Sequence, residues 1–253
     1  MKLTVVGCSP AWPNPGGAQS GYLLEAPGCG RLLLDCGPGV LARLRLHDEW
    51  PVVDAIAITH FHLDHWGDLV PWVWGALAGP GAESEKPELV TPPGGHALLA
   101  DLAVRLGGWE DMFDQVFRVR EFTPDQPTEI VGYELVARRV PHYTLEAYGF
   151  RISQNGVRLA YSGDSGPSEK LPEIARDCDL FVCEATLLDG ESELRGHLTL
   201  PEAESAFEDS GAHRLLVTHR PKERPTDGLH ELAYEGLEIL LEPRPQTVKR
   251  PSA

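Results

Sequence analysis

The stretch His60-Phe61-His62-Leu63-Asp64-His65 follows directly on the apolar run Val53–Thr59. It places three imidazoles and one carboxylate, all groups that bind metal ions, within six residues. Residues two apart in an extended segment point to the same side, so we expect His60 and His62 to share one side. Asp64 and His65 should point elsewhere, because the chain turns there toward a helix. This arrangement predicts two adjacent metal ions rather than one.

Ligands of these two kinds favour zinc, with manganese and iron as alternatives. A single histidine after a strand usually has a structural role. Three histidines and one aspartate in six residues are difficult to explain in that way, so we interpret the stretch as part of a metal site.

Five short apolar runs have the composition of strands that are covered on both faces. They are Arg31–Asp35, Val53–Thr59, Arg158–Ser162, Leu180–Cys183 and Arg214–Thr218. A polar group ends each run or follows it within two residues. Functional groups of layered α/β folds collect at the carboxyl ends of strands, so these ends predict one shared site. In chain order the groups are Asp35, His60, Asp164, Glu184 and His219.

Helical patterns lie between these runs. Gly95–Leu106 has apolar residues at helical spacing after a Pro-Gly breaker. Leu200–Ser210 follows Thr199, a suitable N-cap, and Glu202 stands three residues after that cap. Leu229–Leu240 is a weaker helical candidate, because Gly236 interrupts it.

Two coordination shells need more ligands than the six-residue stretch provides. His142, Asp164 and His219 are the candidates, since each stands at or near the end of an expected strand. Taken singly, each is more typical of a structural residue. Taken together, they would supply a third histidine for each ion and a carboxylate between the two.

With these residues in place, the chain resembles the metallo-β-lactamase superfamily, whose hallmark is HxHxDH followed by His, Asp and His. The resemblance runs from Leu3 to about Leu241 and implies an α/β fold, a four-layer αββα sandwich with the site at one edge. It also implies that Asp164 bridges two divalent ions and that Asp35 orients ligands without touching the metal. The remaining ligands that it implies are His60, His62 and His142 for the first ion, and Asp64, His65 and His219 for the second.

Two further motifs are similar to elements of ribonuclease Z-like phosphodiesterases: Glu184-Ala185-Thr186 and Gly196-His197-Leu198-Thr199. In that branch the histidine acts on the phosphate or the leaving group, and the glutamate orients it. The same role is implied here for His197 and Glu184. A surface role for Glu184 and a capping role for His197 are the structural alternatives.

The chemistry of phosphodiester hydrolysis is consistent with this set of residues. Two metal ions roughly 3.5–4 Å apart can bind the phosphate and deprotonate a water that bridges them. His197 would then give a proton to the departing alkoxide. Asp64 takes part in catalysis as a ligand, and for that reason it is a weaker candidate for the acid.

The size and charge of the chain favour a small anionic substrate. Ribonuclease Z inserts a long tRNA-gripping arm between its third histidine and the bridging aspartate. Here only residues 143–163 fill that interval, enough for one hairpin with a turn at Gln154-Asn155-Gly156. The net charge of −16 also disfavours nucleic acid. We therefore expect small phosphodiesters, cyclic phosphates or cyclic nucleotides among them, as in small bacterial phosphodiesterases that the chain also resembles.

Three alternatives stay open at this stage. The first is a hydrolase of carboxylic esters, thioesters or lactones within the same superfamily, which would need no acid at His197. The second is a tRNA 3′-processing endonuclease. The third is a scaffold without catalysis, which would be expected to have lost some of the seven ligands.

The sequence also indicates how the chain divides into domains and in which compartment it works. We expect one domain over residues 1–241 and a mobile tail over residues 242–253. The five cysteines follow no CxxC spacing, and no segment is typical of a secretion signal or a membrane span, so we expect a cytoplasmic, reduced protein. A homodimer stays open, and no membrane partner is expected.

Several other side chains have more than one interpretation. Trp66, Trp72 and Trp74 could form an aromatic wall at the site, but core or dimer packing is favoured. Arg139, Arg220 and Lys222 stand near expected ligands and could bind a phosphate or lie in solvent.

Overall fold

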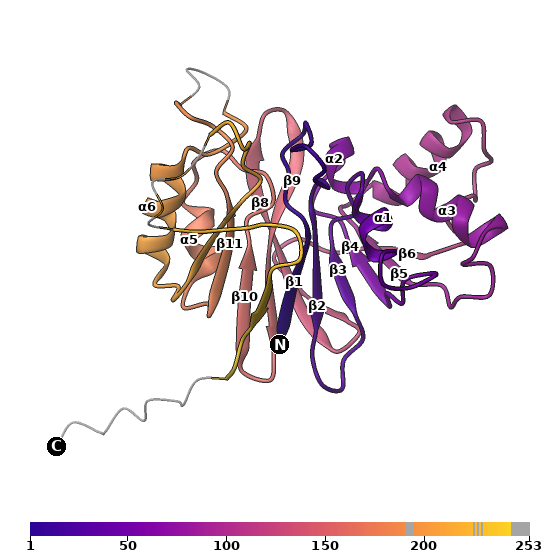
Figure 1. Ribbon diagram of the computed structural model, residues 1–253, viewed down its shortest axis with the longest axis horizontal. Coiled ribbons are helices and arrows are strands. Elements are labelled where there is room, and N and C mark those ends of the chain that lie inside the picture. Colours follow the sequence, from indigo (N-terminus) through magenta and orange to yellow (C-terminus); the bar gives the residue numbers. More distant parts are fainter. Residues whose placement is uncertain (191–194, 225, 227, 229, 244–253) are drawn as a thin grey trace.

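Two seven-stranded β-sheets lie face to face in the centre of the computed structural model, and helices cover both outer faces (Figure 1). The structure describes residues 1–190, 195–224, 226, 228 and 230–243. The architecture is the expected αββα sandwich.

The first sheet is mixed. Its strands β3 to β6 run parallel, whereas β14, β1, β2 and β3 pair antiparallel. In spatial order its strands are β14 (Glu238–Leu240), β1 (Lys2–Gly7), β2 (Gly21–Glu25), β3 (Leu32–Leu34), β4 (Ala55–Ala57), β5 (Glu88–Thr91) and β6 (Arg118–Glu121). Its outer helices are α1 (Val40–Leu44), α2 (Leu63–Trp66), α3 (Leu69–Ala78) and α4 (Gly95–Arg105).

The second sheet is also mixed, with β10 to β13 parallel and β7 to β10 antiparallel. In spatial order its strands are β13 (Glu231–Leu232), β12 (Leu215–Thr218), β11 (Leu180–Glu184), β10 (Val157–Tyr161), β9 (Leu145–Gln154), β8 (Tyr133–His142) and β7 (Pro127–Ile130). Its outer helices are α5 (Lys170–Ala175) and α6 (Leu200–Ser210).

Three apolar clusters hold the four layers together. The largest fills the space between the sheets and includes Leu24, Leu34 and Phe150. A second joins the first sheet to its helices, and a third joins the second sheet to α5 and α6. Removal of this apolar surface from water is the main force that fixes the strand ends relative to one another.

The five expected buried strands and two of the expected helices are present. Each strand lies within two residues of its expected bounds, and α6 spans Leu200–Ser210 with the predicted capping box at Thr199 and Glu202. The expected hairpin is β9 and β10. Its turn places Asn155 and Gly156 at φ values of 46° and 81°, the left-handed conformations that a tight hairpin turn of this kind requires.

The expected helix over Leu229–Leu240 is wrong. The described residues of this segment form β13, which pairs with β12, and β14, which pairs with β1. Backbone groups that a helix would satisfy internally bond to the sheet instead, as in the 2.8 Å bond from the Gly236 amide to the Val5 carbonyl. Gly236 itself has a φ of 90°, which ends any helical run. Leu229 lies outside the described residues.

The expected tail also falls mostly on residues outside the description, which covers only 242 and 243 of residues 242–253. Its mobility and the single domain over 1–241 therefore stay predictions. Within the described residues, no helix combines the length and apolar character needed to cross a bilayer.

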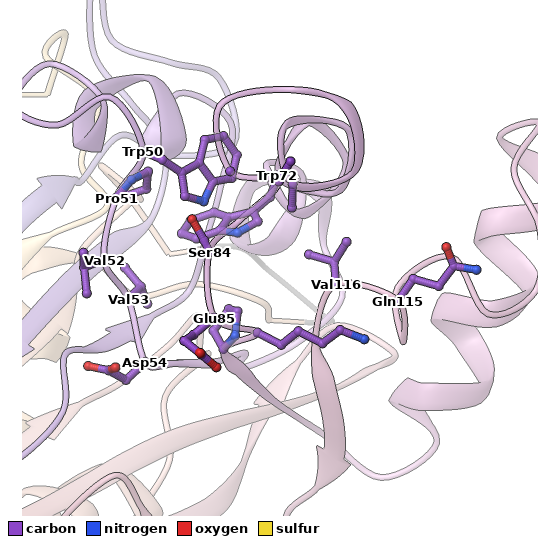
Figure 2. A pocket seen from close by; sticks show the side chains of 15 residues that line it. Trp50, Pro51, Val52, Val53, Asp54, Trp72, Ser84, Glu85, Gln115 and Val116 are labelled. Atoms are coloured by element: carbon purple, nitrogen blue, oxygen red, sulfur yellow. The ribbon is translucent and has the colours of Figure 1, made fainter.

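Trp50 packs against the cluster between the first sheet and its helices, near the end of β4 that is away from the expected site. A Cβ at Gly75 or Gly81 would come within 2.2 or 2.3 Å of its ring, so both glycines are needed for this packing. Trp50 and the residues around it line a pocket of about 310 Å³ (Figure 2). Because Val53 and Asp54 precede β4, this pocket and the histidine stretch lie at opposite ends of that strand.

Candidate metal centre

Strand ends of both sheets bring all seven predicted ligands together at one edge of the sandwich. The stretch after β4 and the short helix α2 carry four of them, and the second sheet supplies the other three from the ends of β8, β10 and β12. In Figure 1, α2 lies at the upper edge of the two sheets. The first sheet supplies His60, His62, Asp64 and His65, and the second supplies His142, Asp164 and His219.

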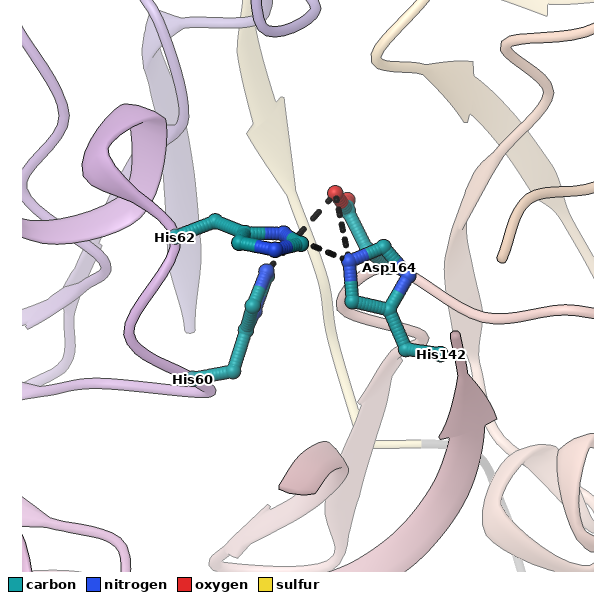
Figure 3. A group of neighbouring side chains, drawn as sticks. All are labelled: His60, His62, His142 and Asp164. Atoms are coloured by element: carbon teal, nitrogen blue, oxygen red, sulfur yellow. Dashed lines mark hydrogen bonds and ion pairs between the residues drawn. The ribbon is translucent and has the colours of Figure 1, made fainter. Parts of the chain in front are cut away.

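One cluster is formed by His60, His62, His142 and Asp164 (Figure 3). Nε2 of His142 lies 2.7 Å from Nδ1 of His62 and 3.9 Å from Oδ2 of Asp164. Nε2 of His60 lies 3.8 Å from the same carboxylate oxygen. Ligand atoms held about 2.0–2.1 Å from one zinc ion lie roughly 3–4 Å apart, so this cluster has the dimensions of a metal site.

A second cluster shares Asp164 with the first and adds Asp64, His65 and His219. Nε2 of His65 lies 3.2 Å from Asp164 Oδ2 and 3.5 Å from Asp64 Oδ2. Nε2 of His219 lies 3.1 Å from Asp64 Oδ2 and 3.6 Å from Asp164 Oδ1. His60 and His62 therefore serve one cluster, Asp64 and His65 serve the other, and Asp164 stands between them.

Several atoms that face these clusters have no hydrogen-bond partner although they are fully buried. They are Nε2 of His60, Nε2 of His65 and Oδ1 of Asp164. A buried polar atom without a partner costs roughly 1–3 kcal/mol. Cations at the centres of the two clusters would satisfy all three atoms, so the donor set fits two divalent ions.

Three histidines of the clusters are oriented from behind through their second ring nitrogen. His142 Nδ1 donates to the Gly196 carbonyl at 2.6 Å, and His65 Nδ1 donates to Asp35 Oδ2 at 2.7 Å. Nδ1 of His219 lies 2.9 Å from the Thr186 hydroxyl. These bonds leave Nε2 of each ring directed at the cluster, which is how ligating histidines are usually held.

Asp35 is itself fixed by groups that no motif in the sequence reveals. The Thr59 amide and hydroxyl and the Tyr161 hydroxyl donate to its carboxylate. Its φ of 58° is unusual for a residue with a side chain. Asp35 stands directly after β3, and with this backbone conformation its carboxylate faces His65.

Burial and charge set the protonation of the ligands. Burial lowers the pKa of His60 well below its usual range and also lowers the pKa of His62 and His142, so all three favour the neutral form that binds metals. Burial alone would raise the pKa of Asp164, but the imidazoles of His219 and His65 outweigh it and hold that pKa well below its usual value. Asp164 therefore stays an anion between the clusters.

His197 and Glu184 form a hydrogen-bonded pair beside the second cluster. His197 Nδ1 lies 2.9 Å from Glu184 Oε1 and 3.9 Å from Asp164 Oδ2. Burial acts to lower the pKa of His197, but the Glu184 carboxylate outweighs it and raises the pKa to about 9. A protonated imidazole is thus held at the edge of the clusters.

Thr186 connects this pair to a ligand. Its hydroxyl lies 2.8 Å from Glu184 Oε2 and 2.9 Å from His219 Nδ1, so Nδ1–H can donate to the hydroxyl while the hydroxyl donates to the carboxylate. The Glu-Ala-Thr motif contained this residue, but its sequence context did not reveal the contact with His219, which is 33 positions away.

The clusters open into a pocket of about 830 Å³. His62, Asp64, Asp164, His197 and His219 line its base. Two aromatic residues and one arginine also line the pocket: Trp12, Tyr143 and Arg224. None of these three was predicted from the sequence.

The cations that the sequence suggested for phosphate binding do not line this pocket. Arg139 pairs with Glu146 at the surface, and Arg220 donates to the Ala185 carbonyl. Lys222 contributes a backbone amide to Asn14. These three residues stand close in sequence to the predicted ligands, but that position did not predict where their side chains point.

The three tryptophans after the histidine stretch do not form a wall at the site. Trp66 and Trp72 are buried in the cluster beneath the outer helices. Trp74 is exposed and lies beside Trp109, with ring centroids 6.2 Å apart. Core packing, the favoured interpretation, therefore holds for Trp66 and Trp72.

Comparison with known proteins agrees with this geometry. Residues 30–220 match the Beta-lactamase superfamily domain. An uncharacterised protein of Mycobacterium tuberculosis is 35% identical over 224 residues, which cover 87% of this chain and 81% of that protein. Ribonuclease Z of Myxococcus xanthus is 27% identical over an alignment of 307 positions, gaps included, that covers 95% of this chain and 98% of that enzyme.

The probable metallo-hydrolase YhfI of Bacillus subtilis is 28% identical over 234 residues, 92% of each chain. The crystal structure of YhfI superposes with a TM-score of 0.80 over 94% of this chain and 98% of that one, at 24% identity. Sequence, fold and a metal-binding cluster of histidines and aspartates thus agree. The chain belongs to the beta-lactamase superfamily and is a metal-dependent hydrolase.

Proposed function

We propose that this chain hydrolyses small phosphodiesters, cyclic phosphates and cyclic nucleotides among them, with two divalent ions, zinc in the first instance. The observation that carries the proposal is the pair of His197 and Glu184, joined at 2.9 Å, beside the two clusters. A hydrolase of activated esters or thioesters has less need of a protonated acid at that place, because an aryl oxide or a thiolate departs without a proton. Cleavage of a phosphodiester expels an alkoxide, which does need one.

The two ions would be held as the resemblance implies, by His60, His62 and His142 on one side and Asp64, His65 and His219 on the other, with Asp164 between them. When bound, such ions neutralise charge on the phosphoryl oxygens and activate water. Asp64 serves there as a ligand, because its Oδ2 faces both His65 and His219.

His197 and Glu184 provide the proton for the leaving group. His197 holds a proton on the ring nitrogen that faces the pocket, since its Nδ1 is bound to Glu184. Glu184 keeps that ring in position and is itself held by the amide of Ser165 and by Thr186. His197 can therefore transfer its proton to the leaving oxygen without a rearrangement of the site.

The interval between the third histidine and the bridging aspartate supports a small substrate. It contains β9, β10 and two turns, and no arm projects from it. The net charge of −16 would repel a polynucleotide, whereas bound divalent ions would attract a small anion into the pocket.

The replacement His197→Ala tests the proposal. We expect it to keep both ions and to reduce kcat on a phosphodiester with an alkoxide leaving group by about 10²–10⁴-fold, the usual contribution of a positioned acid. The loss should be much smaller when the leaving group is p-nitrophenolate, which departs without a proton. Metal content is measured by atomic emission, and kcat is measured from the rate of product formation.

His96→Ala is the matched control, because His96 also pairs with a carboxylate at 2.9 Å but lies at the surface with Asp114. It should leave both rates unchanged. Equal losses on both leaving groups, or no loss on either, would contradict an acid at His197.

A further inference from the structure

Two partly exposed aromatic side chains line the pocket above the clusters. Trp12 is 49% exposed and Tyr143 is 38% exposed. Trp12 follows β1 of the first sheet, and Tyr143 follows β8 of the second, so each sheet contributes one ring. Large aromatic rings that remain exposed inside a pocket are suited to contact a ligand.

Tyr143 is held in place by an unusual local structure. Its φ of 47° is unfavourable for a residue with a bulky side chain. Its ring lies against Gly196, where a Cβ would come within 2.1 Å of the ring. The ring centroid is 5.1 Å from that of His142 and 5.7 Å from that of His197. Strain of this kind persists where the surrounding structure enforces it, and it occurs preferentially at functional sites.

The loop that carries Trp12 is anchored on both sides. The buried Gln19 side chain donates to the Pro10 and Ala11 carbonyls, at 3.3 and 2.5 Å. Asn14 donates to the Arg220 carbonyl at 3.2 Å and accepts from the Lys222 amide at 2.9 Å. The indole is therefore presented to the pocket from a fixed backbone.

We propose that Trp12 and Tyr143 bind a flat aromatic ring carried by the substrate, so that the enzyme selects phosphodiesters of nucleosides or aryl alcohols over those of alkyl alcohols. This inference rests on the proposed function for the nature of the ester. The pocket of about 830 Å³ is large enough for a phosphate and one such ring. Arg224 lines the same pocket and adds a positive charge for an anionic ester.

Three substrates with one leaving group test this selection: the methyl, phenyl and thymidine-5′ esters of p-nitrophenyl phosphate. Each releases p-nitrophenolate, so differences in kcat/KM come from the retained group. We expect the wild-type protein, loaded with zinc, to prefer the phenyl or the thymidine ester over the methyl ester by about 5- to 50-fold, the range that ring stacking supports. The phenyl and thymidine arms distinguish an aryl group from a nucleobase.

Trp12→Ala and Tyr143→Leu should each reduce this preference at least about 5-fold, mainly through KM. Tyr143→Phe keeps the ring and should retain the wild-type preference. Trp74→Ala is the matched control, since Trp74 is 48% exposed but lies outside the pocket. This replacement should leave kcat/KM on all three esters unchanged.

Calorimetric binding of thymidine 5′-monophosphate and methyl phosphate to the same proteins separates failure of this inference from failure of the proposed function. We expect tighter binding of the nucleotide to the wild-type protein and loss of that difference in Trp12→Ala and Tyr143→Leu. If no ester is hydrolysed although the nucleotide is preferred, the proposed function fails and this inference stands. If the preference is absent, or survives both replacements, the aromatic subsite is contradicted.

Discussion

Two opposing effects act on the proton of His197. Burial favours the neutral ring, while the Glu184 carboxylate favours the charged one and raises the pKa to about 9. Because a general acid works only while protonated, the activity that depends on it is present below this pKa and is lost as the pH rises through it. Bound cations would favour the neutral ring and place this limit below about 9.

We therefore predict that kcat/KM for an alkoxide-releasing phosphodiester falls about tenfold per pH unit on the alkaline side. In His197→Ala the same limb should be absent. A pH–rate profile of both proteins from pH 6 to 10 measures this. An alkaline limb that is identical in the two proteins would assign it to another group.

Thr186 joins the His197–Glu184 pair to His219 of the second cluster, because its hydroxyl lies 2.8 Å from Glu184 and 2.9 Å from His219. Thr186→Val keeps the shape of the side chain and removes the hydroxyl. We expect zinc affinity at the second cluster to fall about 10- to 100-fold, as is usual when a partner behind a ligand is lost. Competition with a chelator of known affinity measures the change, and Thr128→Val, which lies in β7, serves as the control. Unchanged affinity would show that Thr186 does not orient His219.

The His60–His65 stretch and the positions of three residues at strand ends predicted the seven side chains that the structure brings together in two clusters, and the resemblance implied how they divide between two ions. The sequence did not predict Thr59, Tyr161, Trp12 or Tyr143, because these residue types are common and only the fold brings them to the site. Spacing in sequence also misplaced Arg220, whose side chain turns back to a carbonyl of its own sheet.

At the scale of elements, the strand ends of two sheets meet at one edge. Runs covered on both faces were predictable, because continuous apolar composition is specific to such strands. The segment before Leu240 was not, since β13 and β14 have two and three residues and depend on pairing with β12 and β1. Strands that short leave no periodic pattern, and tertiary pairing overrides the weak helical one.

Each cluster takes ligands from both sheets, so bound ions would tie the sheets together at this edge. We predict that chelation lowers the unfolding temperature and that added zinc restores it. An ion at 100 times its dissociation constant stabilises the folded state by about 2.7 kcal/mol, roughly 5–10 °C for a domain of this size. Differential scanning fluorimetry measures the shift, and Asp164→Asn should reduce it. An unfolding temperature that does not respond to zinc would contradict a site shared between the sheets.

At the scale of the whole molecule, charge and topology favour the same class of substrate. The acidic surface disfavours polynucleotides, and the short interval between His142 and Asp164 leaves no arm to hold one. The pocket at the edge of the two sheets is of the size that small ligands occupy. These features support the proposal of a small substrate over tRNA more strongly than any single residue does.

The proposed hydrolysis of small phosphodiesters is tested by kcat/KM of the zinc-reconstituted protein on a cyclic nucleotide, an aryl phosphodiester, a lactone, a thioester and a precursor tRNA under the same conditions. We predict that at least one of the two small phosphodiesters is hydrolysed about 10²-fold or more faster than the lactone, the thioester and the tRNA, as expected for a site in which two divalent ions would bind a phosphoryl group beside a positioned acid and no arm holds a tRNA. Faster hydrolysis of the lactone or thioester, or cleavage of the tRNA in preference to both small phosphodiesters, would contradict it.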